Sequence, residues 1–203
     1  MGEAERHLAK VCPGMKKVVG RHEPYPSKFE RFKDPYRALV RAVVYQQLSG
    51  KAAATIHGRV LALWPGKKHP DPEDLIKSKP ETLRGAGLSR QKIAALKDIA
   101  QKRLDGIIPH QRSLAHLPDE AIIERLTQAK GVGRWTVEMY LMFSLGRPDV
   151  LPIDDLGVRK GASKIIGREL TPKELGEYGA RWAPWRSAAA WHCWRATDTV
   201  TME

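Results

Sequence analysis

The stretch Leu126-Thr-Gln-Ala-Lys-Gly-Val-Gly-Arg-Trp-Thr136 is the most informative part of this sequence. A helix ending near Lys130, a turn at Gly131-Val132-Gly133 and a new helix from Arg134 would together form a tight helical hairpin. Glycine lets a backbone approach a ligand closely, and the first amides of a new helix point outward, so such a turn can bind a phosphate oxygen. The same glycines would also suit plain helix C-caps, and the turn alone leaves both interpretations open.

Helix signals continue from this hairpin in both directions along the chain. A capping residue or a proline precedes each apolar stretch, as at Asp34-Pro35, Asp71-Pro72 and Thr171-Pro172. Within these stretches the apolar residues recur three and four positions apart, which is helical spacing. No stretch alternates with period two for long enough to predict a strand. We therefore predict an all-α protein of about ten short helices, joined by loops of about 3–8 residues.

Composition changes near residue 146 and suggests a boundary between two helical lobes. The residues Asp149–Ile153 read as an extended connector. Four of the six tryptophans follow this connector, and we expect three of them, Trp182, Trp185 and Trp191, to be core residues. We expect one lobe at 36–148, with the hairpin at about 120–145, and a second lobe at 1–35 plus 149–203.

Charge and composition restrict the class of protein. The chain has 203 residues, and 35 Lys and Arg against 23 Asp and Glu give a formal net charge of +12, which favours a polyanionic partner such as nucleic acid. The longest apolar stretches are far shorter than the roughly 20 residues of a membrane span, and no secretory signal is expected at the start. Two cysteines are too few for a disulfide framework or a four-thiolate metal site. We expect a soluble intracellular protein with reduced thiols.

Asp155 ends the extended connector, at the point where a further helix opens. An ionised carboxylate there could act on a sugar held nearby, or it could serve only as the N-cap of that helix. Together with Asp154 it could also bind Mg²⁺, as in a nuclease that transfers phosphoryl groups. No third carboxylate or histidine stands at a supporting spacing, which makes the metal site the weakest of the three interpretations.

Four separated motifs, taken in order, resemble the helix–hairpin–helix/Gly-Pro-Asp DNA glycosylases. Among these the chain is most similar to the AlkA-type 3-methyladenine DNA glycosylases, in a compact form without the extra N-terminal domain. The likeness runs from about residue 35 to 195, and it implies two helical lobes with the active-site cleft between them. The motifs are Tyr45–Ser49 followed by Lys51–Ala53, KGVGRWT at 130–136, LPIDD at 151–155, and Trp182–Ser187 leading to Trp191–Trp194.

The resemblance implies a DNA repair enzyme of the DNA-3-methyladenine glycosylase II type, which flips out and excises alkylated purines such as 3-methyladenine and 7-methylguanine. Asp155 would be catalytic, because a carboxylate stabilises the positive charge that builds on the deoxyribose and can orient the attacking water. Electron-rich rings attract a cationic purine. The resemblance places Trp135 and Trp194 in the base pocket. At Met139 the sequence departs from relatives that carry an aromatic stacking residue there, and the adjacent Tyr140 is a further pocket candidate.

The resemblance also implies how the DNA is held. By its place in the motif, Gln47 would be the wedge that fills the gap left by the flipped base, while Leu48 is expected to face the core. Gln47 could instead be an ordinary polar loop residue. The basic run from Arg84 to Arg103 could add a second contact to the DNA backbone or be a solvated face. The residues expected at the DNA backbone are Gly131, Gly133, Arg134, Thr136, Ser49, Ser89 and Arg90.

Several properties follow from the resemblance alone. Relatives that also cut the DNA backbone carry a lysine where this chain has Trp135, so we expect a monofunctional enzyme, without lyase activity, that leaves an abasic site. We expect no required cofactor, no iron–sulfur cluster and no membrane, with a structural Na⁺ or K⁺ on the carbonyl oxygens of Thr127, Ala129 and Val132 as an option.

The expected partner is double-stranded DNA containing damaged bases, bound by a monomer. The expected location is the cytoplasm and nucleoid of a prokaryote or the nucleus of a eukaryote. The alternative is a non-catalytic helix–hairpin–helix protein that binds damaged or structured nucleic acid with the same surface. The range of lesions is left open, because it depends on the shape of the pocket.

Overall fold

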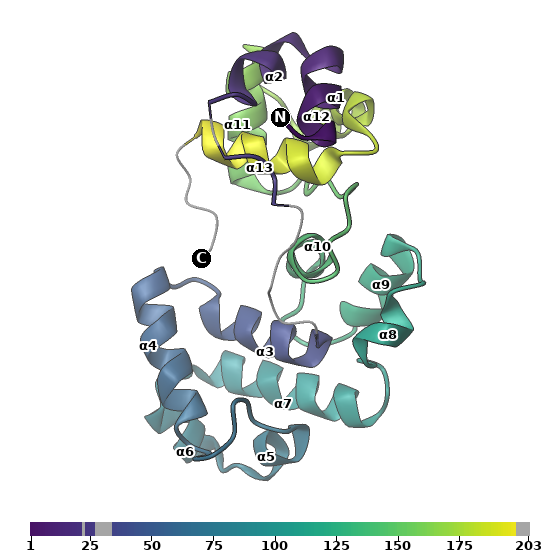
Figure 1. Ribbon diagram of the computed structural model, residues 1–203. Coiled ribbons are helices and arrows are strands. Elements are labelled where there is room, and N and C mark those ends of the chain that lie inside the picture. The colour runs from purple at the N-terminus through teal and green to yellow at the C-terminus, as the bar shows by residue number, and fades with distance from the viewer. Residues whose placement is uncertain (22, 27–33, 198–203) are drawn as a thin grey trace. The chain divides into compact units, whose positions relative to one another are not determined.

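The computed structural model describes residues 1–21, 23–26 and 34–197, and these residues form thirteen α-helices and one 3₁₀ helix without a β-strand (Figure 1). The all-α prediction is therefore confirmed for the described part of the chain. The chain divides into two compact units, with unit 1 formed by 1–29 and 141–203 and unit 2 by 30–140. The division falls within helix α10, Arg134–Phe143, whereas composition suggested a boundary near residue 148. No described helix is long and apolar enough to cross a bilayer.

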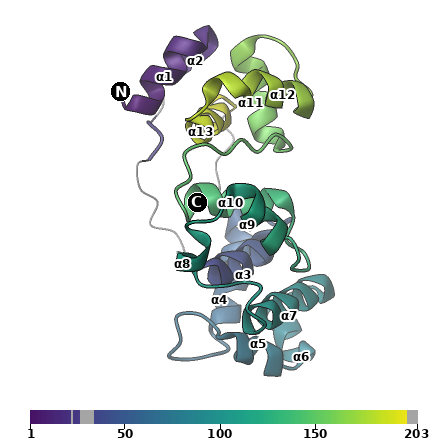
Figure 2. The ribbon, with the colours of Figure 1, turned by 90° about the vertical axis from the view of Figure 1, so that its right-hand side faces the viewer.

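Unit 2 is built around α7, Arg90–Leu104, which lies beside α3, Pro35–Tyr45, and α5, Pro72–Lys77 (Figures 1 and 2). Leu104, at the last position of α7, is exposed, whereas Leu96 and Ile99 are fully buried. Each such side chain contributes about 1.5–3 kcal/mol by leaving water, so α7 acts as the core of the unit. The other helices of unit 2 are α4 at Gly50–Leu61, α6 at Pro80–Gly85, α8 at Gln111–Leu114 and α9 at Asp119–Leu126, together with the first part of α10.

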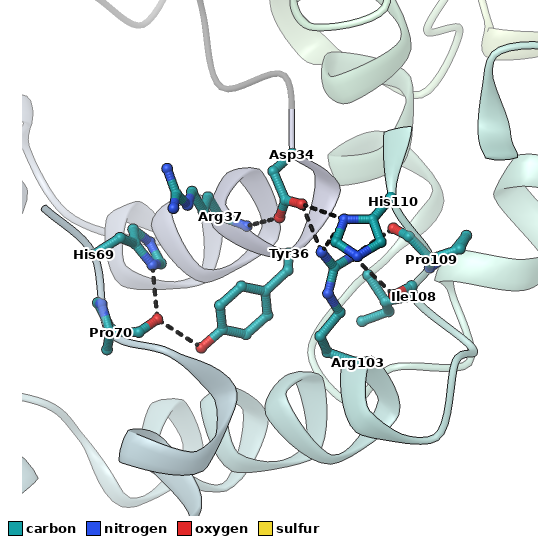
Figure 3. A network of polar contacts seen from close by, with 9 residues as sticks. All are labelled: Asp34, Tyr36, Arg37, His69, Pro70, Arg103, Ile108, Pro109 and His110. Atoms are coloured by element: carbon teal, nitrogen blue, oxygen red, sulfur yellow. Dashed lines mark hydrogen bonds and ion pairs between the residues drawn. The ribbon is translucent and has the colours of Figure 1, made fainter. Parts of the chain in front are cut away.

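A polar network ties the start of α3 to the end of α7 (Figure 3). One carboxylate oxygen of Asp34 caps α3 by accepting a hydrogen bond from the Arg37 amide at 3.2 Å, and the other accepts from Arg103 Nη2 at 2.7 Å. Arg103 also donates to the carbonyl oxygens of Ile108 and Pro109, at 3.1 and 2.6 Å. Charge-assisted hydrogen bonds of this kind are about twice as strong as neutral ones. Arg103 therefore serves the fold of unit 2.

Unit 1 is built around α11, Leu156–Ile166, and α13, Arg186–Ala196, which lie side by side (Figures 1 and 2). Helix α13 is buried from Ser187 to Trp194, so it forms the centre of the unit. Trp182 and Trp191 are 0% and 7% exposed, as expected of core residues, and Trp185 is half-buried. The other helices of unit 1 are α1 at Glu3–Val11, α2 at Pro13–Val18, α12 at Pro172–Gly179, which begins with a capping box, and the 3₁₀ helix at Ala180–Trp182.

A buried carboxylate ties α1 to α13. Glu5 Oε1 lies 3.6 Å from His192 Nε2 and accepts a hydrogen bond from the Tyr25 amide at 3.0 Å. Burial by itself raises the pKa of Glu5, but the amides of Tyr25 and of Glu5 itself, together with His192, bring that pKa below its ordinary value. A carboxyl group with a lowered pKa stabilises the folded state above its unfolded pKa, and this stabilisation is lost as the pH falls through the folded pKa.

We expect Glu5→Gln to lower the free energy of unfolding by about 1–3 kcal/mol at pH 7, because the buried amide then lacks its charged acceptor. The difference from the wild type should shrink as the pH is lowered through the acid range, where the wild-type carboxylate is protonated as well. Thermal unfolding at several pH values measures this. Glu3→Gln, at an exposed acid on the same helix, is the control and should change little. A difference that is the same at all pH values would contradict this role of the Glu5 charge.

Candidate functional site

Asp155 stands at the N-terminal end of α11, where the sequence predicts it. Its Oδ1 accepts a hydrogen bond from the Val158 amide at 2.7 Å and a second from the Trp194 indole Nε1 at 2.9 Å. The first bond makes Asp155 the N-cap of α11, so the capping interpretation holds and is compatible with a catalytic role. The second bond brings together two residues that were predicted separately, the candidate catalytic acid and a candidate pocket ring.

Gly157 makes room for this contact in the first turn of α11. A Cβ at Gly157 would lie 2.8 Å from Trp194 Cδ1 and 3.1 Å from Asp155 Oδ1, which is closer than such atoms pack. The Trp194 ring also lies 6.0 Å from the ring of Phe143, centroid to centroid. The indole therefore contacts both a helix turn and an aromatic ring, with its N–H directed at the carboxylate.

The connector that leads to Asp155 is attached to the start of α13. The Asp149 carboxylate accepts three hydrogen bonds from Arg186, from its amide at 3.2 Å, from Nε at 2.8 Å and from Nη2 at 2.9 Å. The Ser187 hydroxyl accepts a bond from the Val150 amide at 3.0 Å. Paired contacts of this kind restrict geometry as well as adding energy. These positioning residues carry no signal in the sequence, because partners 37 residues apart share no spacing pattern.

The magnesium interpretation gains no support from the structure. Among the described residues, no group of three or more His, Cys, Asp or Glu side chains is close enough to hold a metal ion. Asp154 is exposed beside Asp155, and no further described His, Cys, Asp or Glu side chain joins the pair in such a group. Two carboxylates alone are a weak site for a hard divalent cation, which takes six or more oxygen ligands.

The hairpin of unit 2 has a shorter first helix than predicted. Helix α9 ends at Leu126, so the expectation of a helix ending near Lys130 is wrong. The Ala129 amide turns back to the Leu126 carbonyl at 3.1 Å, and the Lys130 amide donates to Asp98 Oδ2 at 2.7 Å instead of continuing the helix. The second helix, α10, begins at Arg134 as predicted.

The two hairpin glycines have different tasks. Gly131 has a φ of +77°, and a Cβ there would lie 2.9 Å from the Cβ of Ala95 on α7. The chain at Gly131 is both left-handed and in close contact with α7, and glycine is the residue that suits both conditions. Gly133 is exposed, and a Cβ there would meet nothing within 4 Å. The backbone at Gly133 is accordingly open to a ligand.

The polar side chains at the start of α10 are hydrogen-bonded or buried within unit 2. Arg134 forms hydrogen bonds with Glu120 through both terminal nitrogens, and its Nε donates to Glu138 Oε1 at 3.2 Å. Thr136 is only 5% exposed. The groups that the start of α10 directs outward are the backbone amides of its first turn, which can bind a phosphate oxygen.

The loop between α3 and α4 presents Gln47 to solvent. Gln47 has a φ of +57° in the left-handed region and is exposed, while Gln46 donates from Nε2 to the Gly131 carbonyl at 3.0 Å. Leu48 is 38% exposed, so the expectation that it faces the core is wrong. Leu48 directly follows the left-handed residue Gln47, in a loop whose residues 47–49 are all exposed. Ser49 is the N-cap of α4.

Two of the three pocket candidates on α10 share one side of the helix. Trp135 and Met139 are four residues apart, and both are half-buried. Tyr140 is 3% exposed, and burial raises its pKa, with Asp34 adding to the shift and Arg103 opposing it. The Tyr140 phenol is thus buried within reach of the charges of Asp34 and Arg103, and its role in a base pocket stays a prediction.

The basic run from Arg84 to Arg103 has a structural use that the sequence did not suggest. Lys92 Nζ donates to the carbonyl oxygens of Val44 and Gln46, at 2.7 and 2.8 Å, and Lys97 makes equivalent bonds to the end of α5. These ammonium groups cap helix C-termini, where they offset the partial negative charge. The predicted backbone contacts that are exposed at helix starts are Ser49, Ser89 and Arg90.

Comparison with known proteins agrees with this geometry. The family model described as HhH-GPD superfamily base excision DNA repair protein matches residues 40–184. DNA-3-methyladenine glycosylase 1 of Schizosaccharomyces pombe is 40% identical over 200 residues, which are 96% of this chain and 87% of the relative.

Two solved structures resemble the chain over nearly its whole length. The 3-methyladenine DNA glycosylase of Schizosaccharomyces pombe in complex with abasic DNA has a TM-score of 0.87 and 38% identity, covering 100% of this chain and 99% of that one. The DNA-3-methyladenine glycosidase of Bacillus halodurans has a TM-score of 0.82 and 33% identity, covering 98% and 90%.

Proposed function

Because the chain belongs to the HhH-GPD superfamily of base excision DNA repair proteins, we propose that it excises alkylated purines from double-stranded DNA by hydrolysing the N-glycosidic bond. The observation that carries this proposal is the Asp155 carboxylate, held at the start of α11 by the Val158 amide and the Trp194 indole. The solved relatives are named for 3-methyladenine, and we take bases of that type as the substrate.

Asp155 supplies the charge that this reaction requires. As the glycosidic bond breaks, positive charge grows on the deoxyribose, and a carboxylate held in place stabilises it without reorganisation. The same group can orient the water that attacks the sugar. An alkylated purine already carries positive charge and leaves without a strong general acid. The two donors on Oδ1 keep the carboxylate aligned throughout, as a preorganised site requires.

The target base has to leave the stack before the reaction, since its sugar is out of reach inside a duplex. We assign the wedge to Gln47, which is exposed on its loop, and the rings that receive the base to Trp135 and Trp194, with Met139 and Tyr140 as further candidates. Each ring would contribute about 0.5–2 kcal/mol of cation–π attraction. The hairpin amides and the helix starts at Ser49 and Ser89 would hold the phosphates.

We infer that the chemistry needs no cofactor. With Trp135 where a Schiff-base lysine stands in lyases, the product is an abasic site in an intact strand. A monovalent cation would bind the carbonyl oxygens of Thr127, Ala129 and Val132, the oxygen ligands that hard cations prefer. The Ala129 carbonyl oxygen accepts a hydrogen bond from the Val132 amide at 3.1 Å and keeps a second lone pair for such a ligand. We place the enzyme, as a monomer, in the compartment that holds the DNA.

The direct test is to incubate the protein with methylated duplex DNA and to identify the released bases by chromatography. We expect free 3-methyladenine or 7-methylguanine, strands that break only after alkali or heat, and no adduct after borohydride treatment. Strand cleavage abolished by a chelator would indicate the nuclease instead. Tight binding without base release would indicate the non-catalytic binder, and a trapped adduct would overturn the argument from Trp135.

A further inference from the structure

One side of helix α7 contacts both of the loops of unit 2 that we assign to DNA. Lys92, Ala95 and Asp98 are spaced three residues apart, so they follow one another along the same side of the helix. Lys92 contacts the wedge loop, defined here as Gln46–Ser49, while Ala95 and Asp98 contact the hairpin turn at 130–131.

Lys92 holds the wedge loop at the peptide that precedes the wedge. Its Nζ donates to the Val44 carbonyl at 2.7 Å and to the Gln46 carbonyl at 2.8 Å. The Gln46 carbonyl belongs to the peptide group that precedes Gln47. The orientation of this peptide group relative to Gln47 is set by the φ angle of Gln47, which is +57°. A left-handed conformation is unfavourable for a residue other than glycine, so it persists only where neighbouring contacts hold it. The ammonium group is such a contact.

The hairpin turn is held from two directions. Asp98 Oδ2 accepts a hydrogen bond from the Lys130 amide at 2.7 Å, and the Gly131 carbonyl accepts one from Gln46 Nε2 at 3.0 Å. The Gly131 Cα packs against Ala95 so closely that a Cβ would lie 2.9 Å from the alanine methyl. The wedge loop and the hairpin therefore touch each other, and each is attached separately to the same helix.

We propose that Lys92 and Asp98 are positioning residues that set the spacing between the wedge at Gln47 and the phosphate-binding hairpin. This inference rests on the proposed function, because it takes Gln47 as the wedge. The wedge can open a base pair only where the hairpin holds the phosphate beside that base pair. A misplacement of the wedge by about 1 Å can lower the rate about a hundredfold. A helix contacting both loops supplies the rigid spacing.

The test compares Lys92→Met with Lys92→Arg. Methionine keeps a long side chain and removes the hydrogen-bond donor, whereas arginine retains donors. For Lys92→Met we expect kcat/KM on methylated duplex DNA to fall about ten- to a hundredfold, and activity on methylated single strands, which have no pair to open, to change little. Lys92→Arg should recover most of the loss, and Gln47→Ala should show the same duplex-selective loss.

Lys97→Met is the matched control. Lys97 lies on the same helix, and its Nζ makes the same kind of contact, to the carbonyl oxygens of Ile76 and Ser78 at 3.1 and 2.7 Å. Those carbonyls end α5 and belong to neither loop. We expect Lys97→Met to lose thermal stability to a similar extent while its ratio of duplex to single-strand activity stays at the wild-type value.

The role of Asp98 at the hairpin is tested by a second pair of variants. Asp98→Asn keeps an oxygen for the Lys130 amide and should stay close to the wild type. Asp98→Ala removes that acceptor and should weaken binding to undamaged duplex as well, since phosphate contacts do not depend on the base.

A second readout separates this proposal from the glycosylase activity. The fluorescence of a 2-aminopurine placed beside an abasic site in duplex DNA increases when the base is unstacked. Lys92→Met should reduce the fluorescence increase that the wild type causes. The proposal would be overturned if Lys92→Met and Lys97→Met had equal ratios of duplex to single-strand activity and caused equal increases in 2-aminopurine fluorescence. If Gln47→Ala also has no duplex-selective effect, the wedge assignment falls with it while the glycosylase stands. Wild-type unstacking without base release would overturn only the catalytic function.

Discussion

Replacing Asp155 by asparagine is expected to lower base release from methylated duplex DNA by about 10²–10³-fold and to leave DNA affinity nearly unchanged. The asparagine oxygen can still accept hydrogen bonds from the Val158 amide and the Trp194 indole, so the helix cap and the ring position are preserved. Only the negative charge that stabilises the sugar cation is lost. Single-turnover release of bases measures the chemical step, and titration of labelled duplex measures binding.

The neighbouring residue offers the control for this experiment. Asp154 is exposed beside Asp155, and Asp154→Asn makes the same change of charge one position away. We expect it to release bases at nearly the wild-type rate, whereas a two-carboxylate metal mechanism would require both residues. Asp155→Ala is less informative, because it also removes the cap of α11, at a cost of about 0.5–2 kcal/mol. A wild-type rate for Asp155→Asn would remove Asp155 from the mechanism.

Gly161→Ala is expected to be the most destabilising small substitution in unit 1. The added methyl group would lie 1.9 Å from the carbonyl oxygen and 2.4 Å from the carbonyl carbon of Cys193. Because these are backbone atoms, α11 and α13 must move apart. Overpacking of this kind costs up to about 3 kcal/mol, which corresponds to a fall of roughly 6–12 °C in Tm for a chain of this size. Base release should fall too, since the bond from Trp194 to Asp155 joins these two helices.

Gly58→Ala is the matched control for this substitution. Gly58 lies inside α4, and a Cβ there would meet nothing within 4 Å. Alanine is the better helix former by about 1 kcal/mol, so Gly58→Ala should leave Tm unchanged or raise it. Circular dichroism during heating is sufficient for both variants. A Gly161→Ala protein that melts with the wild type would show that α11 and α13 are not packed this closely.

Features that depend on near neighbours in the chain were predictable. The helix starts at Asp34, Asp155 and Thr171 are real N-caps, because a cap is formed between a side chain and the amide three residues later. The all-α class followed from apolar residues three and four apart for the same reason. The family likeness added the order of the motifs, and with it the choice of Asp155 as the candidate catalytic carboxylate.

Local structure and the family of the protein thus follow from residues close together in the chain and from the order of the motifs. The end of α9 depends instead on a distant contact, since the Lys130 amide donates to Asp98, 32 residues away in the chain. In the folded chain Leu48 also faces solvent, and Lys92 holds the wedge loop, across 46 residues, by its bond to Gln46. Such contacts form between groups that folding alone brings together, so no spacing along the chain announces them.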